Sequence, residues 1–109
     1  RRAAAGSEAL MLYAIMARDA PNTAALRPLV RPRHLEYVQP LIDTGRLVFG
    51  GPHPAIDSPD PGPAGYTGSL IIAEFDSIES ARAWSAEDPY VREGVFGDVE
   101  IKPVLKVRP

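Results

Sequence analysis

The stretch RPRHLEYVQPLIDTG, residues 31–45, decides how the rest of this chain is arranged. Its apolar side chains recur at helical spacing, which predicts an amphipathic helix with one face toward a core: Leu35, Val38 and Ile42. Pro32 suits the first position of this helix, and Gly45 suits a left-handed residue just past its end. Pro40 falls inside the helix and removes one backbone donor, so a kink is expected there.

His34 lies beside the apolar stripe, in an i, i+4, i+7 row with Val38 and Leu41. Its ring is therefore expected at the edge of the buried face, within reach of a cavity. Histidine titrates near neutral pH, which makes His34 the first candidate for proton transfer. The alternative is a boundary histidine that hydrogen-bonds a loop and has only a structural role.

The composition indicates one ordinary globular domain. The chain has 109 residues, 45% of them hydrophobic and 24% charged, with a net charge of −2. This balance argues against a nucleic-acid partner, which would require a basic face. No apolar run is long enough to span a membrane, and the absence of cysteine fits a reducing, cytoplasmic setting. We expect residues 1–10 to be a tag or a disordered extension, and residues 11–109 to form the domain.

Four segments of strand character and two of helix character alternate along the chain. The strands are expected at Met11–Arg18, Arg46–Gly50, Ser69–Phe75 and Val99–Val107, and the first and third are apolar on both faces, as in central strands. The last contains Pro103 and lysines, which are typical of an edge. Residues 51–68 are rich in proline and glycine and predict a long loop.

The second helix is expected to follow a capping box formed by Asp76 and Glu79 and to stop at Asp88-Pro89. Its inner row is predicted to contain Ile78, Ala81, Trp84 and Ser85. The resulting order, β-α-β, loop, β-α-β, predicts an α+β ferredoxin-like sandwich, a four-stranded antiparallel sheet with both helices on one face.

The second face of such a sheet needs a cover. Tyr13 and Ile15 on the first strand, with Ile71 and Ala73 on the third, are the expected members of an uncovered apolar face. A homodimer that packs sheet against sheet, or a higher homo-oligomer, would bury it.

Familiar catalytic motifs are absent: there is no Walker loop, HExxH or GxSxG. The two histidines have no metal-ligand spacing, so neither a metal nor another cofactor is expected. The strongest pairing is His34 with Asp88, because two helices on one face can bring the end of the second close to the start of the first. A carboxylate beside an imidazole orients its tautomer and stabilises its protonated form. From spacing alone, the favoured interpretation is that Asp88 simply caps or terminates the helix.

Five segments together resemble the YciI-like family (YCII-related domain): MLYAIMARD, RPRHLEYVQPLIDTGRLVFGGP, AGYTGSLIIAEFDSIESARAW, DPYVREGVF and VEIKPVLKV. The resemblance implies a dimeric ferredoxin-like fold related to the dimeric α/β barrels, of which muconolactone isomerase is one. It also implies a histidine–aspartate active site, which falls on His34 in RPRHL and Asp88 in DPY. The residues expected to line the pocket and bind substrate are Arg31, Gly51, Pro52, Ser69 and Tyr90.

The resemblance implies a lyase or isomerase step on a small, often cyclic, oxygenated compound. Arg31 could bind such a substrate if it is anionic. In this interpretation His34 moves a proton and Asp88 orients it. Two alternatives stay open from the sequence. One is a non-catalytic domain that binds a small ligand in the same pocket, and the other is a dimerisation module with a structural histidine.

Overall fold

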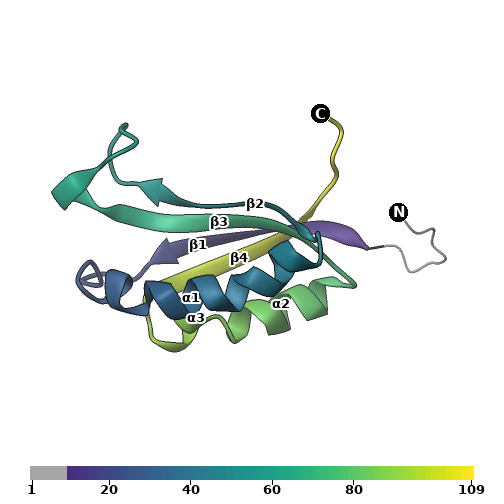
Figure 1. The fold of residues 1–109 in the computed structure, drawn as a ribbon, viewed down its shortest axis with the longest axis horizontal. Helices are drawn as coiled ribbons and strands as arrows, with labels where there is room; N and C mark the ends of the chain where they lie inside the picture. The colour runs from purple at the N-terminus through teal and green to yellow at the C-terminus, as the bar shows by residue number, and fades with distance from the viewer. Residues whose placement is uncertain (1–9) are drawn as a thin grey trace.

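The fold is a four-stranded antiparallel sheet with all helices on one face, as the sequence predicts (Figure 1). The computed structural model describes residues 10–109, so the expectation about residues 1–10 lies, except for Leu10, outside the described part. The elements follow in this order: β1 (Met11–Asp19), α1 (Leu26–Asp43), β2 (Leu47–Pro54), the 3₁₀ turn η2 (Gly62–Ala64), β3 (Tyr66–Phe75), α2 (Ile78–Ala86), α3 (Pro89–Arg92) and β4 (Phe96–Val104).

The strand order is β2-β3-β1-β4, so the two strands with apolar residues on both faces are the central ones and β4 is an edge, both as predicted. The predicted loop at residues 51–68 is too long, because β2 continues to Pro54 and β3 begins at Tyr66. Prolines are tolerated in β2 because it is the other edge strand, where a backbone nitrogen can face away from the neighbouring strand. Only residues 55–65 connect the two strands.

Helix α1 begins earlier than expected, at Leu26, so Pro32 lies inside it and not at its first position. The reason is a buried row at helical spacing that starts upstream of Pro32 and compensates for the missing donors. This row consists of Arg27, Val30, His34, Val38 and Leu41. The expected core stripe is displaced accordingly, since Leu35 and Ile42 are 45% and 50% exposed. Gly45 has φ of 71°, the left-handed conformation expected after the helix.

Helix α2 has a capping box, but one residue later than predicted. Ser77 is the N-cap, because its extended backbone lets its hydroxyl accept from the amide of Ser80, while the Ser80 hydroxyl accepts from the amide of Ser77. Asp76 precedes the cap. The helix ends before Asp88, which caps the short α3 instead.

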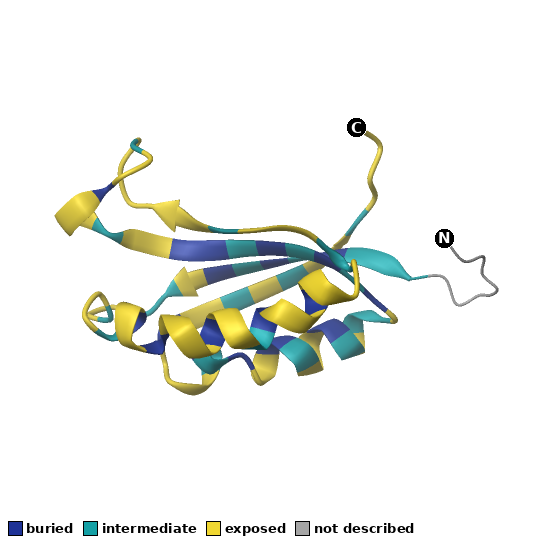
Figure 2. Ribbon diagram, viewed as in Figure 1, coloured by how far each residue is buried: buried dark blue, intermediate teal, exposed yellow. Residues whose placement is uncertain are grey.

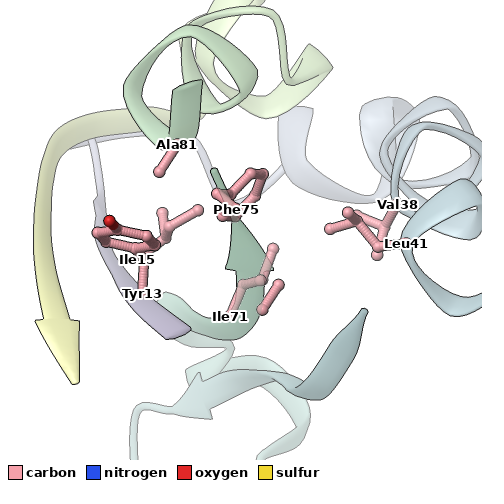
Figure 3. Close-up of a cluster of buried hydrophobic side chains, with 8 residues drawn as sticks. Tyr13, Ile15, Val38, Leu41, Ile71, Phe75 and Ala81 are labelled. Atoms are coloured by element: carbon pink, nitrogen blue, oxygen red, sulfur yellow. The ribbon is translucent and has the colours of Figure 1, made fainter. Parts of the chain in front are cut away.

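The main core lies between the helices and the sheet, where Val38 and Leu41 of α1 point toward Ile71 and Phe75 of β3 (Figure 3). A second cluster joins β1, α1, α3 and the start of β4 through Ala17, Val30, Tyr90, Val95 and Phe96. The side chains predicted for the uncovered sheet face are instead under the helices: Tyr13, Ile15, Ile71 and Ala73 are all at most 6% exposed.

The open face of the sheet carries the alternate residues, because successive strand residues point to opposite sides. Ala14 faces Ile72 across β1 and β3, and Met16 faces Leu70. Figure 2 shows the resulting alternation of buried and intermediate residues along β3. The open face is therefore apolar, as expected, but built from the other set of residues.

Candidate functional site

A cavity of about 600 Å³ lies between α1, β2, β3 and the segment around η2. The backbone of α1 packs closely on α3 and stays farther from the strands of the sheet. Leu35, Val38 and Ile42, the apolar stripe of the sequence, face this cavity, so their spacing marks the cavity wall and not only the core. The opposite wall is formed by Leu47, Gly50, Gly51, Pro52 and Ile71.

His34 lies on the cavity wall and forms a hydrogen bond with Asp88: its Nδ1 is 2.8 Å from Asp88 Oδ1. Asp88 is 2% exposed and stands behind the ring, away from the cavity lining. Its carboxylate also accepts from the backbone amide of Tyr90 at 2.9 Å, which makes it the N-cap of α3. The hydrogen bond to the Tyr90 amide thus fixes the position of the Asp88 carboxylate, and the carboxylate fixes the orientation of the His34 imidazole.

The second ring nitrogen of His34, Nε2, has no hydrogen-bond partner within residues 10–109. No side-chain nitrogen or oxygen buried in that part of the chain lacks a partner, so Nε2 is accessible. With Nδ1 donating to Asp88, the neutral ring has its lone pair on Nε2. This arrangement presents a proton acceptor to whatever occupies the cavity.

Two aromatic rings hold the imidazole. Tyr90 stacks on it, with ring centroids 4.1 Å apart, and Phe96 meets it edge-on at 6.4 Å. Burial raises the pKa of Tyr90, and the charges of Asp19 and Asp88 act in the same direction, whereas Arg27 and Arg31 lower it. Tyr90 therefore contacts His34 as a neutral phenol.

An ion pair between Arg27 and Asp19 adjoins the same cavity. Arg27 Nη1 donates to both carboxylate oxygens of Asp19 at 2.8 and 3.0 Å, and Nη2 donates to Ser69 Oγ at 2.8 Å. The guanidinium also lies 4.8 Å from the centre of the Tyr90 ring, in a cation–π contact. Burial raises the pKa of Asp19, and the adjacent Arg27 opposes this effect.

All five predicted substrate-binding residues line this one cavity: Arg31, Gly51, Pro52, Ser69 and Tyr90. The sequence reasoning missed the charged pair on its wall, Asp19 and Arg27. The signal for Arg27 was present, since it stands seven residues before His34 on the same helical face, but the helix was expected to begin only at Pro32. His53, which falls in the loop predicted at residues 51–68, is exposed on β2 and does not line the cavity.

Groups of three or more side chains suited to hold a metal ion are absent from residues 10–109. Within the same residues, no helix is both long enough and apolar enough to cross a membrane.

Comparison with known proteins assigns the class. The family model described as "YCII-related domain" matches residues 11–105, so the chain belongs to the YCII-related family. It is 54% identical over 97 residues to the protein YciI of Escherichia coli O6:H1, an alignment that covers 89% of this chain and 99% of that protein. An uncharacterised protein of Haemophilus influenzae is 47% identical over the same proportions.

Among solved structures, the fold resembles that of the 5-chloro-2-hydroxyhydroquinone dehydrochlorinase TftG from Burkholderia phenoliruptrix AC1100. The TM-score is 0.75 and the sequence identity 26%, covering 84% of this chain and 91% of TftG. TftG was solved in complex with 2,5-dihydroxybenzoquinone.

Proposed function

We propose that this protein is a small, cofactor-independent enzyme that catalyses a lyase or isomerase step on a small oxygenated, often cyclic, compound. The observation that carries the proposal is the 2.8 Å bond from His34 Nδ1 to Asp88, with the ring on the wall of a cavity large enough for such a compound. The similarity to TftG, a dehydrochlorinase, supports the same class of reaction.

In the proposed mechanism, the Nε2 lone pair of His34 takes a proton from a carbon next to a carbonyl group. The electrons of the broken C–H bond form an enolate, and the new imidazolium is stabilised by the Asp88 carboxylate. In an elimination the enolate electrons expel a leaving group from the neighbouring carbon, and His34 later releases its proton to water. In an isomerisation His34 returns the proton to a different atom of the same molecule. Neither path requires an oxidant or a reductant.

The first experiment follows proton abstraction directly. The protein is incubated in D₂O with cyclic ketones and lactones, and deuterium incorporation is measured by mass spectrometry. Chloride release from 5-chloro-2-hydroxyhydroquinone is measured in parallel. We expect the rate of exchange or chloride release to be about 10²–10⁴-fold lower in His34→Gln than in the wild type, as for the loss of a general base. Asp88→Asn is expected to lose activity as well.

His53→Gln is the matched control, because His53 is an exposed histidine outside the cavity wall. It should leave the rate unchanged. Activity that survives in His34→Gln, or is lost equally in His53→Gln, contradicts the proposal.

One observation favours the alternative of a non-catalytic binding domain. Arg31 is exposed on the cavity rim, and within residues 10–109 it forms no ion pair, so it is available to an anionic ligand. In that case an anion would bind equally well to wild type and His34→Gln, would require Arg31, and would undergo no exchange or elimination.

We also propose that a second copy of the chain covers the open face of the sheet. This face carries apolar side chains that remain half-buried in one chain: Leu12, Ala14, Met16, Leu70 and Ile72. Phe49 pairs with Ile72 and is 51% exposed, which extends the patch onto β2. Light scattering should give the mass of a dimer for wild type and of a monomer for Ile72→Glu. A wild-type monomer at micromolar concentration contradicts this part of the proposal.

A further inference from the structure

The contacts of Arg27 determine which way the hydroxyl of Ser69 can point. A guanidinium group only donates hydrogen bonds, so at the 2.8 Å contact Ser69 Oγ must be the acceptor. The Ser69 proton is therefore not used in this bond, and no acceptor for it is found elsewhere in residues 10–109. Ser69 is 6% exposed and lies on the cavity wall, so the cavity is where an acceptor can reach it.

Arg27 is itself held on all sides. Its side chain and that of Asp19 are 9% and 10% exposed, and the two contacts to Asp19 use both carboxylate oxygens. The Gly68 carbonyl and the ring of Tyr90 occupy other parts of the guanidinium. A group fixed in this way cannot swing out to meet a ligand, so its effect on the cavity passes through Ser69.

The charge of this arrangement also matters. Asp19 neutralises Arg27, so the cavity wall at Ser69 offers a polarised hydroxyl and not a free positive charge. Such a donor interacts weakly with a neutral carbonyl oxygen and more strongly with the oxyanion that the carbonyl becomes when a neighbouring proton is removed. The site is thus better suited to the oxyanion of an enolate, or to a ligand that imitates one, than to a neutral carbonyl oxygen.

We propose that Ser69 is the oxyanion-binding residue of this cavity, with Asp19 and Arg27 as positioning residues that direct its hydroxyl. The substrate class that fits is a compound with a carbonyl oxygen next to an acidic C–H bond. Its oxygen meets Ser69 and its proton faces Nε2 of His34. This inference rests on the proposed function and names the second half of the same site.

The test uses 2,5-dihydroxybenzoquinone as the probe, because its ionised oxygens imitate an enolate. Binding is measured by titration of its visible absorbance against the wild type and variants. Ser69→Ala should weaken binding by about 10- to 100-fold, as expected for a hydrogen bond to a charged group. Ser69→Thr, which keeps the hydroxyl, should retain most of the affinity. Ser85→Ala is the matched control, since Ser85 is equally buried but lies outside this cavity.

The positioning role is tested by a double-mutant cycle. Asp19→Asn should weaken binding of the probe in the wild-type background. It should have little further effect in the Ser69→Ala background, because Asp19 acts through the Ser69 hydroxyl. Equal effects of Asp19→Asn in both backgrounds overturn the positioning role. Circular dichroism identifies a variant that has not folded, and in that case Ser69→Ala against Ser69→Thr decides the question.

The two proposals fail in different ways. If the probe binds wild type and Ser69→Ala equally, the role of Ser69 is refuted while deuterium exchange by His34 is untouched. If Ser69→Ala weakens binding of the probe but His34→Gln exchanges deuterium as fast as the wild type, the oxyanion-binding role of Ser69 is supported and the proton-transfer function of His34 is refuted. Failure of the wild type to bind the probe at millimolar concentration overturns the assigned substrate class.

Discussion

Replacing Arg27 by methionine would break a buried ion pair without removing the apolar stem of the side chain. The partner carboxylate of Asp19 would then be left in a site where only 10% of its surface is exposed. Breaking a buried pair from one side costs about 3–5 kcal/mol of unfolding free energy, because the remaining charge loses its partner without regaining water. For a domain of this size, such a loss lowers Tm by more than about 10 °C.

Arg92→Met provides the matched control. Arg92 contacts Glu87 at 2.6 Å, a shorter distance than the 2.8 Å between Arg27 and Asp19, but both side chains are about 60% exposed. Water can replace each partner, so the expected cost is about 1 kcal/mol or less. A ranking by distance alone predicts the opposite order of stability, so the comparison isolates burial as the cause.

The pH dependence gives a second criterion. Burial raises the pKa of Asp19 above its ordinary value of 3.8, and removing Arg27 removes the charge that opposes this effect. Between the ordinary pKa of Asp19 in the unfolded chain and its raised pKa in the native state, the native state binds more protons than the unfolded state. The free energy of unfolding therefore falls as the pH rises through this range. The deficit of Arg27→Met should therefore be larger at pH 7 than at pH 4. Urea unfolding followed by Trp84 fluorescence measures both, and equal deficits, or a deficit no larger than that of Arg92→Met, refute the reasoning.

Three further predictions concern single groups. Burial raises the pKa of Tyr37 and Tyr90, so their neutral forms stabilise the fold below pH 10. This contribution to stability is lost as the pH rises further. Each Tyr→Phe variant should remove one high-pH step from an ultraviolet titration. Gly68→Ala would place a Cβ against the Ala17 carbonyl and should cost at least about 1–3 kcal/mol in urea unfolding, whereas Gly50→Ala meets only ordinary contacts. Nitrogen NMR should find neutral His34 protonated at Nδ1, and the opposite tautomer contradicts the assigned role of Asp88.

Strand positions and topology could be predicted because apolar periodicity and turn residues carry that information locally. The orientation of β1 could not. Met11–Asp19 is apolar on both faces, so alternation gave no reason to place Tyr13 and Ile15 under the helices and not on the open face. That choice depends on where α1 and α2 dock, which no single strand encodes.

Half of the site was visible in the sequence and half was not. His34 and Asp88 could be paired because two helices on one face bring the end of the second close to the start of the first. The family resemblance was the stronger argument for this pair. Arg27 was missed because Pro28 and Pro32, which follow it, interrupt the sequence pattern at the start of α1. Its partnership with Asp19 and Ser69 joins three separate elements, and such contacts depend on tertiary packing that spacing along the chain does not reveal.

The residues that line the cavity differ in how much the fold depends on them. Val38 and Ile71 belong to the main core, so substitutions there endanger folding. Leu35, Ile42 and Tyr66 also line the cavity, but they are 41–50% exposed and belong to neither buried cluster. Directed evolution could therefore reshape the cavity through these exposed residues at little cost to stability and leave His34 and Asp88 in place. New specificities should be easier to select in this protein than new catalytic groups.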